Sequence, residues 1–510
     1  MKLSFLFLFQ NPLIACSSST DDTATGEPAD EDDSNGTGET DDSGTDTDDS
    51  DTGVDTSDTE EPIEVGEMGA LLYAISGEEA DDNFGFRVRN IADYNGDGRS
   101  EFAIGAPYYK PQDIGQIAGA VAIFDGQQDG VGLAQEDRQA LIVAEAAYDY
   151  FGQQLYSCDL DDDNLPELLV GSGNHETDGE MLGAVLLYDL PLYGDYSTGN
   201  AATKFTGPSI YSSFGSSIAC VSGAQLLAVG APYDENDLGQ EYAGSLLLFE
   251  APFSGVVDHT AAIAEIQGDH EGQQMGVGSS LADVNGDGVL DLMVSGGAES
   301  AGGTGSGSAG VFLGPISGLK SIADADNLYR EPNPGDSLGN TLISGKDINQ
   351  DGYIDLAISS YHESTSAYRA GMVYLLHGST TGAPPLDEAQ ARFHGRTEYG
   401  YGGVSIAFLD DFSNDGRPDV AIGEYGARIT KDGEQIGAVH VFLDASTGVY
   451  EFSDAELSIY GDEDRVGAFG YHIDALDDAD GDGLSDLLIG AYTQDSGTGM
   501  VYLYSGGNPE

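Results

Sequence analysis

Six acidic loops of nine residues are the part of this sequence that could do chemistry. They begin at Asp93, Asp159, Asp283, Asp347, Asp411 and Asp478 and read DYNGDGRSE, DLDDDNLPE, DVNGDGVLD, DINQDGYID, DFSNDGRPD and DADGDGLSD. Each carries oxygen-bearing side chains at positions 1, 3, 5 and 9 and a turn former near position 6. Calcium takes about six to eight oxygen ligands, and the EF-hand loop uses the same first, third and fifth positions with a main-chain carbonyl at the seventh. The sequence therefore predicts calcium as a cofactor, with about six ions.

The predicted metal ligands are the side chains at positions 1, 3, 5 and 9 and the main-chain carbonyl at position 7. They are Asp93, Asn95, Asp97, Arg99 and Glu101; Asp159, Asp161, Asp163, Leu165 and Glu167; Asp283, Asn285, Asp287, Val289 and Asp291; Asp347, Asn349, Asp351, Tyr353 and Asp355; Asp411, Ser413, Asp415, Arg417 and Asp419; and Asp478, Asp480, Asp482, Leu484 and Asp486. Asp and Asn also make ordinary turns, so one such loop alone would be weak evidence. Because an acidic hairpin repels itself until an ion neutralises it, we expect the role of the ions to be structural.

The acidic loops belong to a longer repeat. A residue pair ending in glycine marks each copy, and the seven pairs are Phe84-Gly85, Phe151-Gly152, Phe214-Gly215, Met275-Gly276, Leu338-Gly339, Tyr401-Gly402 and Phe469-Gly470. Seven repeats of about 63 residues therefore fill the chain from about residue 68 to the C-terminus. The third repeat, which reads CVSGAQL from Cys220, has no acidic loop.

Short apolar runs predict four strands in each repeat. The first follows the pair ending in glycine, and the second is a run such as FAIG from Phe102 or LLIG from Leu487, which suits a strand buried on both faces. The third follows a glycine, as in GAVAIFDG from Gly119, and a weaker outer stretch such as ALIVAE from Ala140 closes the unit. Four strands in each of seven units predict an all-β, seven-bladed β-propeller over residues 68–510. The glycine-rich AGGTGSGSAG from Ala301 is predicted to be a flexible loop.

The ring needs a closing strand, because the chain ends just after the third strand of the seventh repeat. A spare strand, LLYAIS from Leu71 to Ser76, lies before the first repeat. We expect it to pair with Met500 to Tyr504 as the outer strand of the seventh blade, since an unpaired edge there would be an aggregation hazard.

The Phe-Gly pair, the acidic loop and Gly105-Ala106-Pro107 or Gly230-Ala231-Pro232 together resemble the FG-GAP repeats of the integrin alpha-subunit propeller and its bacterial relatives. The resemblance covers about 440 of the 510 residues. It implies that a protein or glycan ligand binds on the face opposite the calcium loops. The resemblance therefore also implies a role in cell adhesion.

Tyrosines recur just past the second strand, where the resemblance implies the ligand face. The candidate partner-binding residues are Tyr108, Tyr109, Tyr233, Tyr361, Tyr425 and Tyr492. A tyrosine ring with its polar tip is a good interface anchor. The alternative is that these rings pack between the blades, and the two roles are compatible.

The N-terminal segment predicts export and anchoring. Lys2, the apolar run LSFLFLF and then Leu13-Ile14-Ala15-Cys16 resemble a bacterial lipoprotein signal peptide over residues 1–15, with Cys16 as the lipidated residue. Residues 16–67 are rich in Asp, Thr, Ser and Gly and are predicted to be a disordered tether. We therefore expect a lipid-anchored envelope protein at the outer membrane or cell surface, which meets the membrane through the anchor alone. An ordinary signal peptide with an incidental cysteine is the alternative.

Export also bears on the two remaining cysteines, Cys158 and Cys220, which follow the glycine pairs of the second and third repeats. An oxidising compartment permits a disulfide between them. Two buried thiols are the expectation that we favour.

Charge and motifs limit the function classes. The formal net charge of −73 argues against nucleic acid as a partner. The eight histidines form no HExxH pair, so we expect no enzyme activity. The favoured function is a calcium-stabilised binding or adhesion module. The alternatives are a glycan-binding or glycan-processing propeller and a structural component of an envelope complex. Carboxylates and aromatic rings gathered in a pocket opposite the loops would favour the glycan alternative.

Overall fold

A computed structural model describes residues 69–507, apart from 127–129, 298–304, 331–332, 334, 428–434 and 463–464. The chain divides into two units, Met1–Pro62 and Ile63–Glu510. The predicted signal peptide, Cys16 and the tether lie outside the described residues. In the described residues, the second unit forms seven sheets, each with four antiparallel strands, which are the blades of a propeller, and a small hairpin of β9 (Glu176–Thr177) and β10 (Glu180–Met181).

Each blade runs from an inner strand outwards. The inner strands of blades 1 to 7 are β2 (Arg87–Asn90), β7 (Gln154–Cys158), β14 (Ile218–Cys220), β19 (Met275–Ala282), β24 (Leu338–Ser344), β28 (Ile406–Leu409) and β33 (His472–Leu476). The second strands are β3 (Phe102–Ala106), β8 (Glu167–Ser172), β15 (Leu226–Ala231), β20 (Asp291–Gly296), β25 (Leu356–Ser360), β29 (Asp419–Glu424) and β34 (Asp486–Ala491). These second strands contain the seven predicted apolar runs and are almost wholly buried, as expected for strands packed on both faces.

The third and outer strands complete the blades. The third strands are β4 (Ala120–Phe124), β11 (Ala184–Asp189), β16 (Ser245–Glu250), β21 (Ser308–Phe312), β26 (Met372–Leu376), β30 (Ala438–Phe442) and β35 (Met500–Tyr504). The outer strands are β6 (Ala140–Val143), β13 (Thr203–Thr206), β18 (Ala264–Gln267), β23 (Asn327–Arg330), β27 (Ala391–His394), β32 (Leu457–Tyr460) and, for blade 7, β1 (Leu71–Ser76). Apolar side chains of neighbouring sheets interlock to form the core clusters between the blades.

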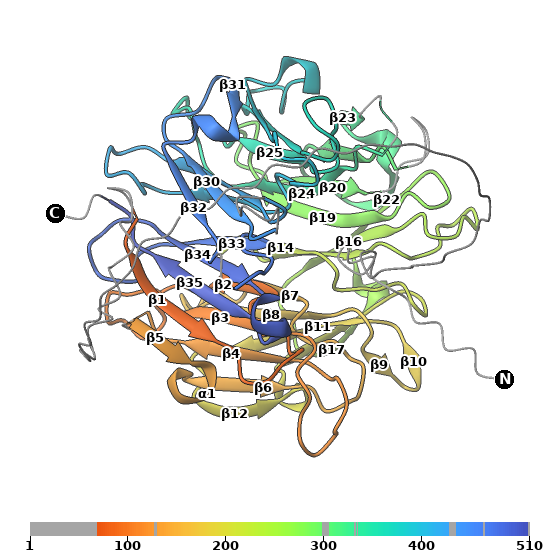
Figure 1. Ribbon diagram of the computed structural model, residues 1–510. Coiled ribbons are helices and arrows are strands. Elements are labelled where there is room, and N and C mark those ends of the chain that lie inside the picture. The colour runs from red at the N-terminus through yellow and green to blue at the C-terminus, as the bar shows by residue number, and fades with distance from the viewer. Residues whose placement is uncertain are drawn as a thin grey trace, which may run out of the picture. The chain divides into compact units, whose positions relative to one another are not determined.

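The blades form a closed ring. Each inner strand contacts the inner strands of the two neighbouring blades, and β33 of blade 7 contacts β2 of blade 1. In blade 7, β1 pairs with β35 in antiparallel register from Leu71 opposite Tyr504 to Ser76 opposite Met500. Figure 1 shows this red strand beside the blue strands of the C-terminal end. The predicted closure of the ring by Leu71–Ser76 is therefore confirmed.

A fifth strand that the sequence did not predict ties blades together. It lies between the third and outer strands of one repeat, yet it pairs in parallel with the outer strand of the preceding blade. These strands are β5 (Gly130–Leu133), β12 (Gly194–Ser197), β17 (Gly255–Asp258), β22 (Gly318–Ser321) and β31 (Gly448–Glu451). Each leads into one short turn: α1 (Ala134–Asp137), η2 (Thr198–Asn200), η3 (His259–Ala261), η4 (Ile322–Asp324) and η6 (Phe452–Asp454). The remaining short turns are η5 (Leu386–Glu388) and α2 (Gln494–Gly497).

The pair ending in glycine docks one blade onto the next. Phe151 bridges in parallel to Gly119, the residue before the third strand of the preceding blade. Gly119 has φ +102°, and a Cβ there would lie 2.3 Å from the Phe151 carbonyl oxygen, so only glycine fits. In blade 6 the residue that makes this bridge is Gly402 and not Tyr401, so the predicted alignment is one residue out. The Phe452 ring lies against Gly402 and occupies the space that a side chain would need.

Two further expectations are wrong. Ser308, Ala309 and Gly310 of the predicted flexible loop lie in β21, because they pair with β20 and β23 on either side. Cys158 and Cys220 form a disulfide and are not two thiols. They end the inner strands of adjacent blades, where their Cα atoms are 6.2 Å apart, a distance that a disulfide spans readily.

Candidate metal loops and the opposite face

The six acidic loops share one backbone conformation. The carboxylate at position 1 accepts the N–H of position 6 at 2.7 to 3.1 Å in every loop. The carboxylate at position 9 accepts the N–H of position 2 at 2.6 to 3.1 Å. The glycines at position 6 of five loops have φ between +83° and +95°, and Asn164 takes φ 68° at this position in the loop at 159. Each loop is thus folded around its own carboxylates.

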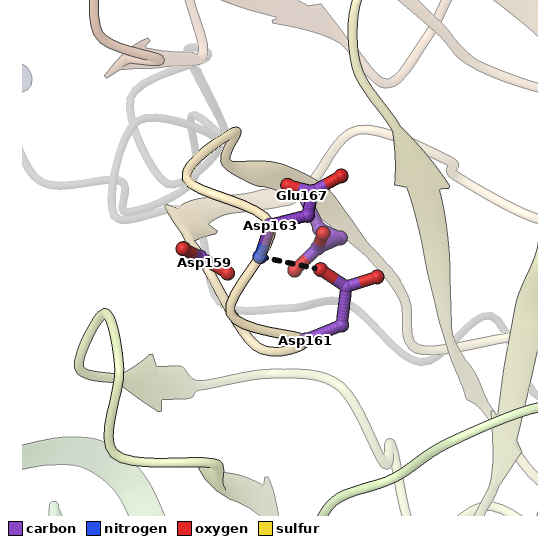
Figure 2. A group of neighbouring side chains, drawn as sticks. All are labelled: Asp159, Asp161, Asp163 and Glu167. Atoms are coloured by element: carbon purple, nitrogen blue, oxygen red, sulfur yellow. Dashed lines mark hydrogen bonds between the residues drawn. The ribbon is translucent and has the colours of Figure 1, made fainter.

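Three loops gather carboxylate oxygens tightly enough for a cation. The groups are Asp93, Asp97 and Glu101; Asp159, Asp161, Asp163 and Glu167; and Asp478, Asp480 and Asp486, each with ligand oxygens within 4.8 Å of one another. Figure 2 shows the four acidic side chains of the loop at 159 gathered at one turn. Calcium–oxygen distances of about 2.3 to 2.6 Å place oxygens on opposite sides of an ion about 5 Å apart. These groups therefore fit a calcium ion.

The loop at 411 fits a cation for a different reason. Asp419 at position 9 is 0 % exposed, yet its Oδ1 has no hydrogen-bond partner, and neither has the buried Oγ of Ser413 at position 3. In the loops at 283, 347 and 478 the corresponding carboxylate oxygen accepts a glycine N–H. A buried carboxylate oxygen without a donor is costly, and a bound cation would compensate it.

In two loops the asparagine at position 3 donates a hydrogen bond to the carboxylate at position 5. The Asn285 amide donates to Asp287 at 3.1 Å, and the Asn349 amide donates to Asp351 at 2.9 Å. Asn349 is also 2.8 Å from Nδ1 of His377. A bound ion would require the amide oxygen in place of the N–H, so these two side chains would have to turn. Coordination by the main-chain carbonyls at position 7 stays a prediction, since the bonds found there come from their N–H groups.

Burial raises the pKa of the carboxyl at position 9 in all six loops. The pKa is about 7 for Glu101, Glu167 and Asp486, about 6 for Asp355 and Asp419, and raised for Asp291. Neighbouring loop carboxylates add to the rise for Glu101, Glu167, Asp291, Asp419 and Asp486, while hydrogen bonds from main-chain N–H groups oppose it. Holding these groups ionised at neutral pH therefore costs free energy unless a positive charge is present.

The strand order separates two ends of the ring. Each acidic loop joins an inner strand to the second strand, so the six loops share one end, which we call the loop face. The start of each inner strand and the end of each second strand lie at the other end, as the pairing of Leu338 with Ser360 shows for blade 5. We call this the opposite face.

The six candidate tyrosines lie toward the opposite face, and two of them are closed to a partner. Tyr425 and Tyr492 are 2 % and 0 % exposed and belong to a cluster of buried rings. Tyr361 packs against this cluster. Tyr108 and Tyr233 make edge contacts with Tyr150 and Tyr242, and Tyr109 packs on the core between blades 7 and 1. The alternative expectation, that the rings pack between blades, describes Tyr109, Tyr425 and Tyr492. Partner binding by Tyr108, Tyr109, Tyr233 and Tyr361 stays a prediction.

The opposite face of blade 5 carries a pocket that the sequence did not predict. It has a volume of about 390 Å³ and is lined by Asn333, Gly335, Asp336, His362, Glu363, Ser364, Thr365, Tyr368 and Arg369. Asp336 and Glu363 are 5 % and 3 % exposed. Asp336 Oδ2, Glu363 Oε2 and His362 Nε2 have no hydrogen-bond partner. We call this the blade-5 pocket.

A second group that the sequence did not predict is a buried Ser-His-Glu chain in blade 6. His440 lies 2.9 Å from Ser458 Oγ and 3.1 Å from Glu424 Oε2, because the three residues sit on adjacent strands of one sheet. A nucleophile needs such a relay, but His440 and Glu424 are only 4 % and 3 % exposed. The burial gives a substrate no access to this histidine.

Comparisons with known proteins agree with the repeat. The FG-GAP repeat model matches residues 84–124 and 469–504, which hold the acidic loops of blades 1 and 7. Phosphatidylinositol-glycan-specific phospholipase D of Rattus norvegicus is 31 % identical over 179 residues, which is 34 % of this chain and 20 % of the relative. Integrin alpha-5 of Xenopus laevis is 27 % identical over 230 residues, 42 % of this chain and 20 % of the relative. The chain thus spans about a fifth of the length of these curated relatives.

Among solved structures, the Dos1 propeller is similar with a TM-score of 0.44 and 13 % identity, over 86 % of this chain and 96 % of that one. The propeller architecture described above rests on the strand pairing. The chain thus contains FG-GAP repeats in its first and last blades and is similar over part of its length to integrin alpha subunits and to the phospholipase D. Within the described residues, no helix has the length and apolar character needed to cross a membrane.

Proposed function

We propose that this protein is a calcium-stabilised propeller, held at the cell envelope by a lipid on Cys16, that binds a protein or glycan partner with its opposite face. The observation that carries the proposal is the difference between the two ends of the ring. One end concentrates carboxylates in six loops of one conformation, and the other holds a pocket with buried polar groups that lack partners.

Calcium is supported by the chemistry of the loops. Their ligands are carboxylate, amide and hydroxyl oxygens at the spacing that a hard cation requires. The ions would neutralise the loop face of a chain whose net charge is −73. The role of the ions is then to hold the inner and second strands of each blade together and not to take part in a reaction.

Binding of a partner is supported by the relatives and by the pocket. Integrin alpha subunits are relatives over 42 % of this chain or less, which favours a protein ligand and an adhesive role. The phospholipase D is named as specific for a phosphatidylinositol-glycan, which favours the glycan alternative. The acidic and aromatic lining of the blade-5 pocket also favours it. We propose no enzyme activity for the Ser-His-Glu chain of blade 6, since the buried His440 and Glu424 offer a substrate no access.

The binding proposal can be tested with the purified chain and intact cells. The calcium-loaded protein, labelled with a fluorophore, should bind cells saturably, and an excess of unlabelled protein should displace it. EDTA should abolish binding, because the ring loses its stabilising ions. Binding that does not saturate would argue against a specific module. Binding that persists in EDTA, at a temperature where the ring has melted, would argue against a calcium-dependent one.

Anchoring is tested separately. The native chain should fractionate with membranes and incorporate labelled fatty acid, and Cys16→Ser should release it into the soluble fraction. A Cys16→Ser chain that stays with the membranes would rule out the anchor while leaving the binding function open.

A further inference from the structure

We infer that the blade-5 pocket binds a neutral sugar unit of a glycan, with the buried carboxylates of Asp336 and Glu363 accepting hydrogen bonds from its hydroxyls and the exposed Tyr368 ring contacting its apolar face. The inference rests on the proposed binding function and names its site and ligand class. It is argued from the buried acids, from the size of the pocket and from its mixture of polar groups.

The same two positions carry a satisfied pair in blade 2. Asp149 and Asp336 both stand two residues before the pair ending in glycine, and the Ser172 and Ser360 hydroxyls donate to their main-chain oxygens at 2.9 and 3.0 Å. The facing residue is His175 in blade 2 and Glu363 in blade 5, and each accepts at its carbonyl the N–H of the glycine before the third strand, at 3.1 Å. His175 Nδ1 lies 2.9 Å from Asp149 Oδ2. Blade 5 therefore sets an acid against an acid where blade 2 has a hydrogen-bonded acid–histidine pair.

Blade 3 also satisfies its buried acid at this place. Asp234 occupies the position of Glu363 and accepts from the Ser209 and Ser245 hydroxyls at 2.5 and 2.9 Å. In blade 5, Glu363 Oε1 accepts the Thr365 N–H at 2.6 Å, but its Oε2 has no donor, and Asp336 Oδ2 has none either. Unsatisfied buried acceptors are rare in proteins because each costs stability, so a donor from outside the chain is the expected partner.

The size of the pocket points to an organic ligand. A volume of about 390 Å³ lies within the range of small-molecule sites. It is far larger than a metal ion needs. Asp336, His362 and Glu363 are also not among the groups of the described residues whose ligand atoms converge within 4.8 Å. A bare divalent cation is therefore a poor fit.

The mixture of polar groups points to hydroxyls and not to a positively charged ligand. Arg369 lines the pocket beside the two acids and contributes donors and a positive charge. Burial, with Arg369 as a smaller cause, lowers the pKa of His362 to about 4, so its imidazole is neutral at physiological pH. Sugar hydroxyls both donate and accept hydrogen bonds, as this lining requires. A lysine or arginine of a partner could only donate, and Arg369 would repel it.

An aromatic ring completes the site. Tyr368 is 51 % exposed and is held by an edge contact with Tyr399 at 5.2 Å between ring centroids. The C–H face of a pyranose packs well against such a ring, which is apolar over its face with one polar tip.

The test uses full-length protein in constant calcium, on an array of immobilised neutral oligosaccharides, followed by titration of the sugar that the array identifies. The decisive variant is Glu363→His, which rebuilds in blade 5 the acid–histidine pair of blade 2. Because that pair is compatible with this fold, the variant should stay folded, and its melting temperature verifies this. Tyr368→Ala is the second variant. His175→Gln in blade 2 is the matched control on the same face.

We expect the wild-type chain and His175→Gln to bind the same sugar equally, and both pocket variants to bind it at least about tenfold more weakly. No sugar bound by the wild-type chain, or a sugar bound equally by Glu363→His, would overturn the inference. Binding of Zn²⁺ that is lost in Glu363→His while no sugar binds would replace it with a metal site. If no sugar binds while labelled protein still binds cells saturably, the inference fails and the proposed binding function survives.

Discussion

The two ends of the ring treat buried acids in opposite ways. At the loop face the position-9 carboxyls are buried in every acidic loop, and each is held by the N–H of position 2. At the opposite face the buried acids differ from blade to blade: His175 pairs with Asp149, serines satisfy Asp234, and Asp336 and Glu363 keep oxygens without partners. The loop face repeats the same hydrogen bond from position 2 in all six loops. At the opposite face, the partners of the buried acids differ from one blade to the next.

This difference separates stability from binding. A feature repeated around a ring serves what all blades need, which is to hold adjacent strands together. A feature in one blade that costs stability and opens to a pocket is more consistent with binding, since proteins retain such costs at functional sites. Changes at the loop face should therefore alter melting, and changes in the blade-5 pocket should alter binding.

The largest effect is expected from opening the ring, on which both ends depend. Deleting residues 68–77 removes β1 and exposes the edge of β35, so the free energy of unfolding should fall by about 3 to 6 kcal/mol, as for exposing two large apolar side chains. Deleting residues 17–60 is the control and should leave the melting temperature unchanged. Chemical denaturation of the two variants compares them, and equal behaviour would contradict closure by Leu71–Ser76.

Single acidic loops should fail one at a time. Asp287→Ala or Asp351→Ala should remove one ion of about 40 Da from the native mass spectrum and leave the other sites filled, because blades contact only their neighbours. Each lost site should cost up to about 2.7 kcal/mol at a hundredfold excess of calcium over its dissociation constant. Loss of all ions together would contradict independent sites, and loss of sugar binding would contradict the separation of the two ends.

Acidity should weaken the effect of calcium on stability. Burial raises the pKa of Glu101 and Glu167 from 4.5 to about 7. Without calcium, the native chain therefore binds more protons than the unfolded chain over this range, and its stability falls as pH rises through it. With calcium the ion takes the place of the protons. The rise in melting temperature on adding calcium should be larger at pH 8 than at pH 5, and an equal rise at both would contradict protonation of the loops.

The smallest expected effect is a gain in thermal stability. Glu363→His should raise the melting temperature by about 1 to 2 °C, because it replaces an acid that faces Asp336 with a partner for it. Differential scanning calorimetry measures this beside His175→Gln, which should lower the melting temperature by breaking the pair with Asp149. A lower melting temperature for Glu363→His would mean that Glu363 stabilises blade 5, contrary to the argument for a ligand.

The sequence predicted the features that recur. The seven second strands, the closing strand and the acidic loops follow from short apolar runs and aspartates at a fixed spacing, which a single chain displays many times. The fifth strands were missed because they have four residues each, are largely exposed and pair with the preceding blade. The offset in blade 6 arose because Phe452, far along the chain, supplies the ring that Tyr401 was expected to supply.

The blade-5 pocket could not be predicted from any one repeat. Neither Asp336 nor Glu363 stands out in its own segment of the sequence. The burial of one oxygen of each without a hydrogen-bond donor lowers stability only because the fold sets the two acids face to face. Two positions would have to be compared across the repeats: the residue two places before each glycine pair, and the third residue after each second strand. This comparison would have paired Asp149 with His175 in blade 2 and Asp336 with Glu363 in blade 5. Such a comparison identifies the acid pair, although the exposure of Tyr368 still depends on how neighbouring blades pack.

The central claim is that calcium in the acidic loops stabilises the ring, and a melting curve tests it most directly. The full-length chain is melted at pH 8 in calcium, after removal of calcium with EDTA, and after calcium is restored. The account predicts a clear fall in melting temperature in EDTA and full recovery with calcium. A melting curve that is the same in all three conditions would contradict it.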